Sequence, residues 1–223
     1  LIFIFLISST LFSVDSFSIH SNEPFLDYKE DKIYTVKMIQ DEIVVDGILD
    51  ESSWDIINKS YNGIQDHLKK EIIHKPDFYQ DYPINLSVPT FDTKVSIQYD
   101  AENIYVAAKL FDSNPDSIEQ RLSRKDDIDP WLSDWFSIEL DSNHDHHSAF
   151  RFVVNSSGVQ LDGIVYGDSE FDLEFNPIWE SSAHIDKDGW SLEMKIPFSM
   201  LSITKLETPW GMNINRYIYR YNE

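Results

Sequence analysis

The segment Asp129-Pro130-Trp131 places a tryptophan in a proline-containing loop just before a predicted strand. An indole at a protein surface offers a flat apolar face, on which the C–H face of a neutral sugar ring can stack. Trp179, two residues after Pro177, is a second candidate for a surface indole. Each tryptophan has the same two alternatives, a sugar platform or a residue that packs against the body of the protein.

Four acidic residues alternate along one segment: Asp168, Glu170, Asp172 and Glu174. In an extended chain, alternating residues point to the same side. Calcium takes oxygen ligands, and carboxylates are its preferred protein donors. The pattern therefore predicts a structural calcium site, with a solvated acidic loop as the alternative.

A second polar segment contains His144, Asp145, His146 and His147. Two imidazoles and a carboxylate can hold zinc or another transition metal. A polar turn that binds no metal is the alternative for this segment.

Arg151 and Arg216 lie among apolar residues in predicted strands. A buried or half-buried guanidinium needs a carboxylate partner. Glu139, Glu193 or Asp162 could supply it. A structural ion pair is one reading of these arginines, and hydrogen bonding to the hydroxyl groups of a ligand, above all by Arg151, is the other.

Composition excludes several classes of function. With 18 basic and 39 acidic residues, the chain of 223 residues carries a net charge of −21, the opposite of a nucleic-acid-binding surface. The absence of cysteine removes thiolate nucleophiles, disulfides and cysteine metal sites. The sequence also contains no G-x-S-x-G or H-E-x-x-H motif. A glycosidase needs two carboxylates across a cleft, and no pair here lies in a distinguishing motif, so no catalytic residue is predicted.

Apolar and polar residues alternate in several short runs, which is typical of strands with one buried face. These runs are residues 95–99, 104–110, 136–140, 150–154, 192–196 and 212–218. One helix is expected at residues 51–58, with Asp50 as its N-cap. The predicted fold class is all-β, a jelly-roll-like antiparallel β-sandwich with one or two short helices.

The chain opens on an apolar run, residues 1–12 (LIFIFLISSTLF). The run is too short to span a membrane and has the length of a signal-peptide core. We therefore expect residues 1–18 to be a signal peptide truncated at its start, followed by a linker and lead-in strand at 19–42 and the sandwich at 43–223. A buried strand or helix is the alternative for the apolar run.

Five segments resemble family 9 carbohydrate-binding modules in their order along the chain. They are 45–54 (VDGILDESSW), 103–106 (NIYV), 133–141 (SDWFSIELD), 189–197 (GWSLEMKIP) and 210–216 (WGMNINR). A closer variant, with AFRFVVNSSGVQLDG at 149–163 and RYNE at 220–223, resembles the N-terminal module of large exported bacterial proteins. In those proteins a C-terminal region that looks like an outer-membrane β-barrel follows the module.

The resemblance implies a non-catalytic module that binds glycan or oligosaccharide through loop aromatics, in the periplasm or outer membrane, with a link to carbohydrate catabolism. It places Trp131 at the position where sugar-binding members present a tryptophan, and Trp179 and Arg151 are further candidates for sugar contacts. It also implies that the rest of the protein, the C-terminal region, is missing from this chain. Two alternatives stay open: an interaction or plug domain that packs on its own C-terminal region without binding sugar, and part of a hydrolase that acts on O-glycosyl bonds.

Overall fold

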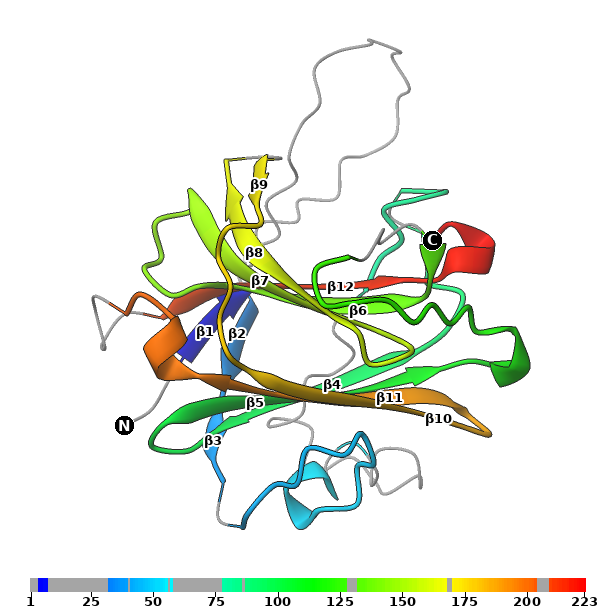
Figure 1. The fold of residues 1–223 in the computed structure, drawn as a ribbon, viewed down its shortest axis with the longest axis horizontal. Coiled ribbons are helices and arrows are strands. Elements are labelled where there is room, and N and C mark those ends of the chain that lie inside the picture. The colour runs from blue at the N-terminus through cyan, green and yellow to red at the C-terminus, as the bar shows by residue number, and fades with distance from the viewer. Residues whose placement is uncertain are drawn as a thin grey trace, which may run out of the picture.

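The computed structural model describes residues 4–7, 32–39, 41–55, 57, 78–85, 87–127, 132–167, 170–203 and 209–223. In this part of the chain the secondary structure is strands and short 3-10 turns. The strands form two sheets that lie face to face, as Figure 1 shows with the larger sheet above the smaller one. The predicted all-β sandwich is confirmed.

The larger sheet has the strand order β2-β1-β12-β6-β7-β8-β9 among the described residues. Its strands are β1 (Ile4–Ile7), β2 (Lys32–Thr35), β6 (Trp135–Asp141), β7 (Ser148–Asn155), β8 (Gln160–Tyr166), β9 (Glu170–Asp172) and β12 (Trp210–Tyr217). Neighbouring strands are antiparallel except β1 and β12, which pair in parallel.

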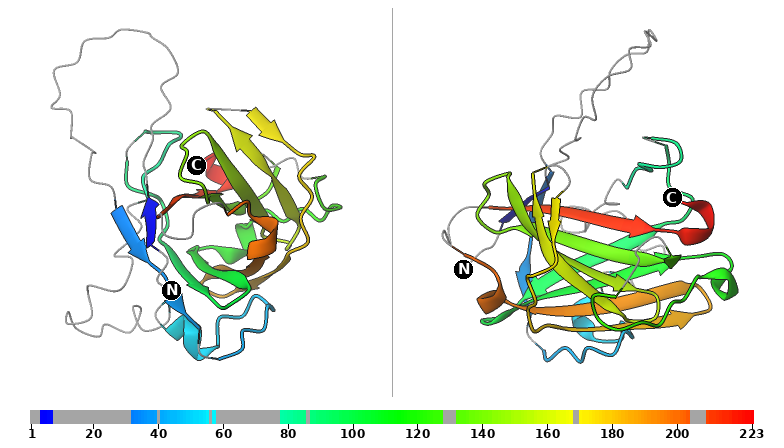
Figure 2. Two further views of the ribbon diagram at one scale, coloured as in Figure 1. Left: turned by 90° about the vertical axis from the view of Figure 1, so that its left-hand side faces the viewer. Right: turned by 45° about the horizontal axis from the view of Figure 1, so that its top comes forward.

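The smaller sheet has the described order β10-β11-β5-β4-β3. Its strands are β3 (Lys37–Met38), β4 (Thr93–Tyr99), β5 (Asn103–Phe111), β10 (Glu180–Asp186) and β11 (Gly189–Pro197). Here β3 and β4 are the parallel pair. Figure 2 shows the two layers from two further directions, with the short strand β1 beside the start of β12 and β2 on the far side of β1.

The core lies between the sheets and is built from the inward faces of alternating strands. Phe136, Ile138 and Leu140 of β6 are completely buried, as are Leu192, Met194 and Ile196 of β11. Trp190 and Trp210 are buried in this core, whereas Trp54 is buried in a separate cluster that includes Tyr105 and Ala107 of β5. Because both sheets turn one face inward, period-two alternation in the sequence identifies the core strands correctly.

The helix expected at 51–58 begins instead as a 3-10 turn, η1 (Ser52–Trp54), with helical residues at Asp55 and Ile57. Its N-cap is Glu51 rather than Asp50, and no side chain caps it. The other 3-10 turns described are η3 (Pro115–Ser117), η5 (Phe198–Met200) and η6 (Tyr219–Tyr221). Within this segment Trp54 is fully buried.

Residues Ile4–Ile7 of the apolar run form β1, which pairs with both β2 and β12. Strands β1, β2 and β3 thus join the sandwich from a region N-terminal to residue 43. The signal peptide stays a prediction, and cleavage after residue 18 would remove β1 from the sheet. Within the described residues, no helix is long and apolar enough to cross a membrane.

A buried carboxylate joins the segment 43–55 to the smaller sheet. Glu193 of β11 is 0% exposed. It accepts hydrogen bonds from the backbone N–H groups of Asp46 and Gly47, at 3.0 and 2.9 Å, and from the Trp54 indole Nε1 at 2.7 Å. Two of the motif segments, 45–54 and 189–197, therefore meet at this one side chain.

The same burial predicts a pH effect on stability. Burial raises the pKa of Glu193 from its ordinary value of 4.5 to about 7, although the three donors pull it down. Because the folded-state pKa lies above the unfolded one, this stability is fully present below pH 4.5 and is lost as the pH rises through 7. The loss amounts to roughly 3 kcal/mol. We expect urea unfolding at pH 5 and pH 8 to show it in the native chain and to show less of it in Glu193→Gln. An equal pH dependence in both proteins would contradict the assignment to Glu193.

Candidate functional site

The outer face of the larger sheet carries the polar and aromatic side chains that the core excludes. Strand pairing sets them in rows across β12, β6 and β7. The first row is Tyr217 and Trp135, the second is Asn215, Ser137 and Val153, and the third is Asn213, Glu139 and Arg151. Each row lies two residues along the strands from the next, because only alternate residues face outward.

The aromatic row forms a wall at one end of this face. The rings of Trp135 and Tyr217 are stacked, with centroids 5.7 Å apart and planes 23° from parallel. Trp135 is half-buried. It is the first residue of β6 and points to the outer face, while Phe136 enters the core. There Trp135 packs against a small apolar cluster of Val153, Val159 and Leu161.

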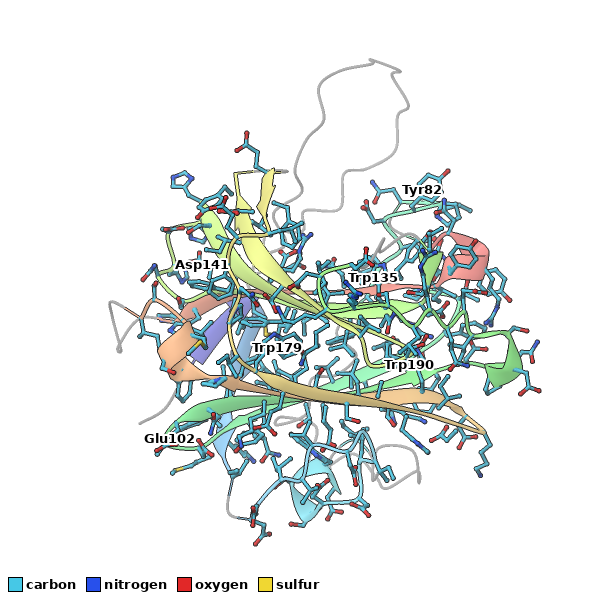
Figure 3. All side chains as sticks on the ribbon, in the orientation of Figure 1. Tyr82, Glu102, Trp135, Asp141, Trp179 and Trp190 are labelled. Atoms are coloured by element: carbon cyan, nitrogen blue, oxygen red, sulfur yellow. The ribbon has the colours of Figure 1, made fainter. Side chains whose placement is uncertain are left out.

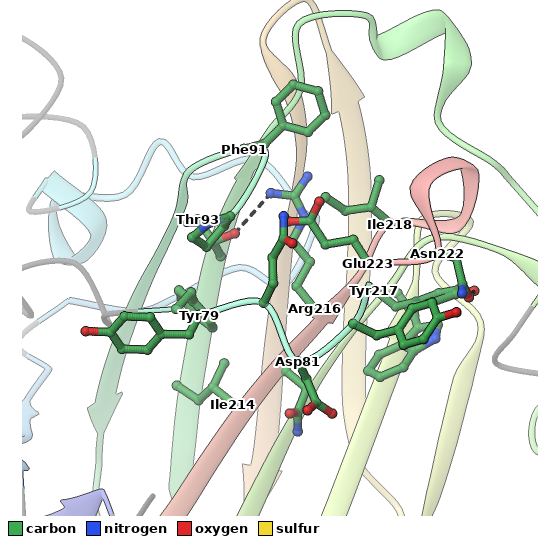
Figure 4. A pocket seen from close by; sticks show the side chains of 16 residues that line it. Tyr79, Asp81, Phe91, Thr93, Ile214, Arg216, Tyr217, Ile218, Asn222 and Glu223 are labelled. Atoms are coloured by element: carbon green, nitrogen blue, oxygen red, sulfur yellow. Dashed lines mark hydrogen bonds between the residues drawn. The ribbon is translucent and has the colours of Figure 1, made fainter. Parts of the chain in front are cut away.

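A cavity of about 460 Å³ lies beside this aromatic wall. Residues of two loop segments, 78–82 and 89–91, and of the end of β12 with the C-terminal turn line it, as Figure 4 shows. Its lining combines aromatic rings with amide, carboxylate and guanidinium groups. These residues are Phe78, Tyr79, Gln80, Asp81, Tyr82, Pro89, Phe91, Thr93, Trp135, Ile214, Asn215, Arg216, Tyr217, Ile218, Asn222 and Glu223.

Hydrogen bonds fix the loop that carries Tyr82 above the sheet. The Thr90 backbone N–H donates to Glu223 Oε1 at 2.8 Å, which joins the loop to the C-terminal turn. The Ser87 hydroxyl donates to Gln80 Oε1 at 2.6 Å, and the Gln80 N–H donates to the Ser87 carbonyl at 3.0 Å. Tyr82 is 60% exposed although it lines the cavity. Figure 3 shows it above the sheet on the side where Trp135 lies.

Two hydrogen-bond donors on cavity-lining residues have no partner in the described part of the chain. They are the indole Nε1 of Trp135 and the guanidinium Nε of Arg216. A buried donor without a partner costs free energy unless water or a ligand satisfies it. The cavity thus offers a stacking surface together with polar groups that can bind hydroxyls, which is the chemistry that a neutral sugar requires.

Arg216 does not form the carboxylate pair expected from the sequence. Its Nη1 donates to the Asp92 carbonyl and the Thr93 hydroxyl, and its Nη2 donates to the Phe111 carbonyl at 2.8 Å. Burial lowers the pKa of Arg216 to about 10, while Asp134 and Asp112 oppose the shift through space. This correction follows from topology, because β12 brings Arg216 to the end of β5 and the start of β4, where the backbone carbonyls of Asp92 and Phe111 face it.

Arg151 forms the structural ion pair that is one of its two readings. Its guanidinium Nε donates to Glu139 Oε1 at 2.6 Å, and Nη2 contacts the same oxygen. The ring of Phe171 lies under the guanidinium, with its centroid 5.4 Å from Cζ. Arg151 remains 34% exposed on the outer face, so a sugar contact stays a prediction for it.

Trp179 does not lie at the surface as predicted for a sugar platform. It is 6% exposed and packs edge-on against Phe152 of the core. Its indole Nε1 donates to the buried carboxylate of Asp162 at 2.7 Å. Lys125 Nζ lies 2.8 Å from the same Asp162 oxygen. The neighbouring Ile178 is the exposed residue, at 83%, so the chain after Pro177 alternates with Trp179 inward.

Trp131 lies outside the described residues, and its role as a sugar platform stays a prediction. The acidic segment is described at three of its four positions, Glu170, Asp172 and Glu174, since Asp168 lies outside. The Asp172 carboxylate accepts the Glu174 N–H at 2.8 Å. No group of three metal-ligating residues is found in the part of the chain that the structure describes. Calcium binding by this segment stays a prediction.

The histidine segment forms a polar turn between β6 and β7. Asp141 accepts the N–H groups of Asp145 and His146 at 3.1 and 2.9 Å. His144 Nδ1 lies 2.6 Å from the Pro209 carbonyl, and its ring meets the His146 ring edge-on. The described contacts of these imidazoles and carboxylates are made within the turn and to the chain before β12, which accords with the polar-turn alternative.

Sequence patterns did not identify the aromatic wall or the overhanging Tyr82. The wall depends on the pairing of β6 with β12, two strands that are about 80 residues apart in the chain. The alternation in the sequence did contain a signal for the outward position of Trp135. Successive residues of a strand point to opposite faces, so Trp135 faces outward if Phe136 faces the core.

The fold and site define a β-sandwich module with an aromatic-lined cavity on one outer sheet face. Comparison with solved structures shows that this fold is similar to that of family 9 carbohydrate-binding modules. A module of this family from Caldicellulosiruptor kristjanssonii, in complex with glucose, matches with a TM-score of 0.50 and 17% identity over 82% of this chain and 76% of that one. A candidate carbohydrate-binding protein from Bacteroides uniformis matches with a TM-score of 0.54 and 15% identity over 83% of each chain. No protein-family model matches the sequence, and no curated protein matches it. The structural similarity establishes the fold.

Proposed function

We propose that this domain binds neutral carbohydrate, without catalysis, in the cavity between Tyr82 and the aromatic wall of Trp135 and Tyr217. The observation that carries the proposal is the coincidence, in one cavity, of stacking surfaces and unpartnered buried donors. The likeness of the fold to modules described with glucose and as carbohydrate-binding supports it.

Charge favours a neutral ligand. The cavity lining includes the carboxylates of Asp81 and Glu223, and the only guanidinium among the described lining residues, Arg216, donates to neighbouring carbonyls. The whole chain has a net charge of −21. An anionic glycan would be repelled by this field, whereas the hydroxyls of a neutral sugar can pair with amides and carboxylates alike.

Trp131 belongs to the same proposal. It precedes Trp135 by four residues, so the chain can separate the two Cα atoms by at most about 14 Å. We propose that its indole supplies a further stacking surface at the rim of the cavity. A sugar contact by Arg151 and calcium binding by Asp168, Glu170, Asp172 and Glu174 are further proposals. Arg151 lies on the outer face, in the row of Asn213 and Glu139.

The setting of the domain is also proposed rather than observed. The apolar opening run supports export to the periplasm or outer membrane, and a role in carbohydrate catabolism follows from binding glycan there. The domain would present glycan to the C-terminal region of its own protein. An interaction domain without sugar binding, and a hydrolase with its chemistry elsewhere, are the competing functions.

The test is a glycan array probed with the purified domain, followed by titration calorimetry with the best ligand. Tyr82→Ala is the informative variant because the side chain is 60% exposed and its loss costs little stability. Loss of one stacked ring should weaken binding by about 1–2 kcal/mol, or about 5- to 30-fold. The matched control is Tyr166→Ala, a 43% exposed tyrosine on β8 that does not line the cavity.

We expect Tyr82→Ala to lose affinity and Tyr166→Ala to keep it, with equal urea midpoints for both. Absence of any glycan binding by the native domain would support the interaction-domain alternative. Equal affinity in the native domain and Tyr82→Ala would place the ligand outside this cavity. Release of reducing sugar from a bound glycan would point to the hydrolase instead.

A further inference from the structure

We propose that Arg220 positions one wall of the cavity, at residues 90–92, by linking this wall to the buried carboxylate of Asp112. Neither Arg220 nor Asp112 belongs to the cavity lining. Arg220 is therefore a positioning residue, which acts on the ligand site through another side chain. This inference rests on the proposed function and deepens it by naming what holds the site in shape.

The wall contacts the C-terminal segment of the chain. The Thr90 N–H donates to Glu223 Oε1 at 2.8 Å, and the Asp92 carbonyl accepts a hydrogen bond from Arg216 Nη1 at 3.1 Å. Phe91, between these two residues, is half-buried and lines the cavity. Figure 4 shows Phe91, Arg216 and Glu223 around the cavity. The position of this wall therefore depends on where the C-terminal segment lies.

The guanidinium of Arg220 lies against the ring of Phe91. Its Cζ is 5.3 Å from the Phe91 ring centroid and 4.8 Å from the Tyr221 ring centroid, and the two centroids are 5.9 Å apart. The Cζ of Arg216, which itself lines the cavity, is 5.9 Å from the Phe91 centroid. A guanidinium within about 6 Å of a ring centroid is attracted to the ring. Arg220 thus joins Phe91 to the C-terminal turn.

Asp112 holds the Arg220 guanidinium in this place. Asp112 Oδ1 accepts hydrogen bonds from Arg220 Nη2 and from the Asn114 N–H, each at 2.7 Å, and Arg220 Nη1 donates to the Ser117 carbonyl at 3.2 Å. The Asp112 side chain is 0% exposed, and its backbone N–H donates to the Asp188 carbonyl at 2.9 Å. A buried carboxylate needs a charged partner. This requirement fixes the guanidinium, which in turn fixes the ring that lines the cavity.

A second ion pair provides a matched control. Lys109 Nζ of β5 lies 2.6 Å from Asp186 Oδ2 of β10, and the Lys109 side chain is 12% exposed, against 17% for Arg220. Neither Lys109 nor Asp186 lines the cavity. Loss of either pair should lower stability, whereas only Arg220 of the two basic residues contacts a ring that lines the cavity.

The experiment uses two measurements on the full chain. Nuclear magnetic resonance gives the backbone order parameter of Thr90 without ligand, and calorimetry gives the affinities for glucose, galactose, mannose and xylose. The variants are Arg220→Gln, Lys109→Gln, and Phe91→Leu alone and combined with Arg220→Gln. Arg220→Gln leaves the charge of Asp112 buried without its partner. If this variant does not fold, Arg220→Gln combined with Asp112→Asn takes its place, because it removes both charges.

We expect the order parameter of Thr90 to fall from about 0.85 to below about 0.6 in Arg220→Gln and to stay unchanged in Lys109→Gln. Arg220→Gln should weaken sugar binding about 3- to 10-fold, and Lys109→Gln should leave it unchanged. In the Phe91→Leu background, Arg220→Gln should cause little further loss, because the ring through which Arg220 acts is gone.

An unchanged order parameter in Arg220→Gln would overturn this role of Arg220 and leave the proposed function in place. The same conclusion would follow from an affinity loss that adds fully to that of Phe91→Leu, or from an equal affinity loss in Lys109→Gln. If the native chain binds none of the four sugars and no glycan on the array, the proposed function fails. The order parameter of Thr90 then decides by itself whether Arg220 positions the wall.

Discussion

Replacing Glu193 with leucine is expected to lower the free energy of unfolding by about 2–6 kcal/mol, because each buried donor left without an acceptor costs about 1–3 kcal/mol. The Trp54 indole and the Gly47 N–H both lose their acceptor in this variant, in a place that water does not reach. The segment 43–55 would then be held to the smaller sheet by apolar contacts and by two remaining side-chain hydrogen bonds, from the Ser191 hydroxyl to the Gly47 carbonyl and from the Gln98 amide to the Ser53 carbonyl. Urea unfolding at pH 7 measures the effect.

A matched substitution separates this role from a general effect of removing a charge. Glu180→Leu removes a carboxylate on the neighbouring strand β10 that is 64% exposed and paired with Lys195 at 3.3 Å. A surface change of this kind should stay within about 0.5 kcal/mol. A double-mutant cycle of Trp54→Phe with Glu193→Gln should give a coupling of about 0.5–3 kcal/mol. A loss below about 1 kcal/mol in Glu193→Leu would show that the three hydrogen bonds do not hold the segment.

The second large effect is expected on ligand affinity. Trp131→Ala should weaken glycan binding about 5- to 150-fold, since an aromatic anchor contributes on the order of 1–3 kcal/mol and 1.4 kcal/mol is tenfold. The physical reason is the loss of the flat indole face on which the sugar ring stacks. Calorimetry with the best ligand from the array measures the change.

The urea midpoint of the same variant separates a platform from a packing residue. An exposed Trp131 can be removed at little cost in stability, whereas truncating a core tryptophan costs roughly 3–5 kcal/mol. Trp190→Ala provides the reference for that larger loss, because Trp190 is completely buried in β11. Unchanged affinity with a lowered midpoint in Trp131→Ala would make it a packing residue.

The strands that sequence periodicity predicted and those that it missed differ in one respect. Five of the six predicted runs lie within β4, β5, β6, β7 and β11, and the sixth, 212–218, runs one residue past the end of β12. Strand β8 was missed because Asp162 and Gly163 interrupt its apolar pattern. Strand β10 was missed because its sequence, ESSAHID, has few apolar residues. Strand β10 lies at the edge of the described smaller sheet, and an edge strand buries little of its own surface, so its sequence carries a weak signal.

The tryptophans also differ in whether the local sequence accounts for their burial. Trp54, Trp190 and Trp210 are buried. Of the two alternatives for Trp179, a sugar platform and a packing residue, the structure shows the second, because Trp179 is buried by a contact with Phe152 and a hydrogen bond to Asp162. Those partners lie on β7 and β8. Their approach depends on how the chain returns to the sheet, which the local sequence does not encode.

By itself, the sequence determined the all-β class and the positions of the core strands along the chain, because alternation and composition are local properties of the chain. Only the tertiary structure decided which groups come together: Glu193 with the turn at 46–47, Arg216 with the carbonyls of Asp92 and Phe111, and Tyr82 with Trp135 and Tyr217 in the lining of one cavity. Each of these arrangements joins residues more than 50 positions apart in the chain. Their pairing follows from strand order and register, which are set by the packing of the whole sandwich rather than by any one segment.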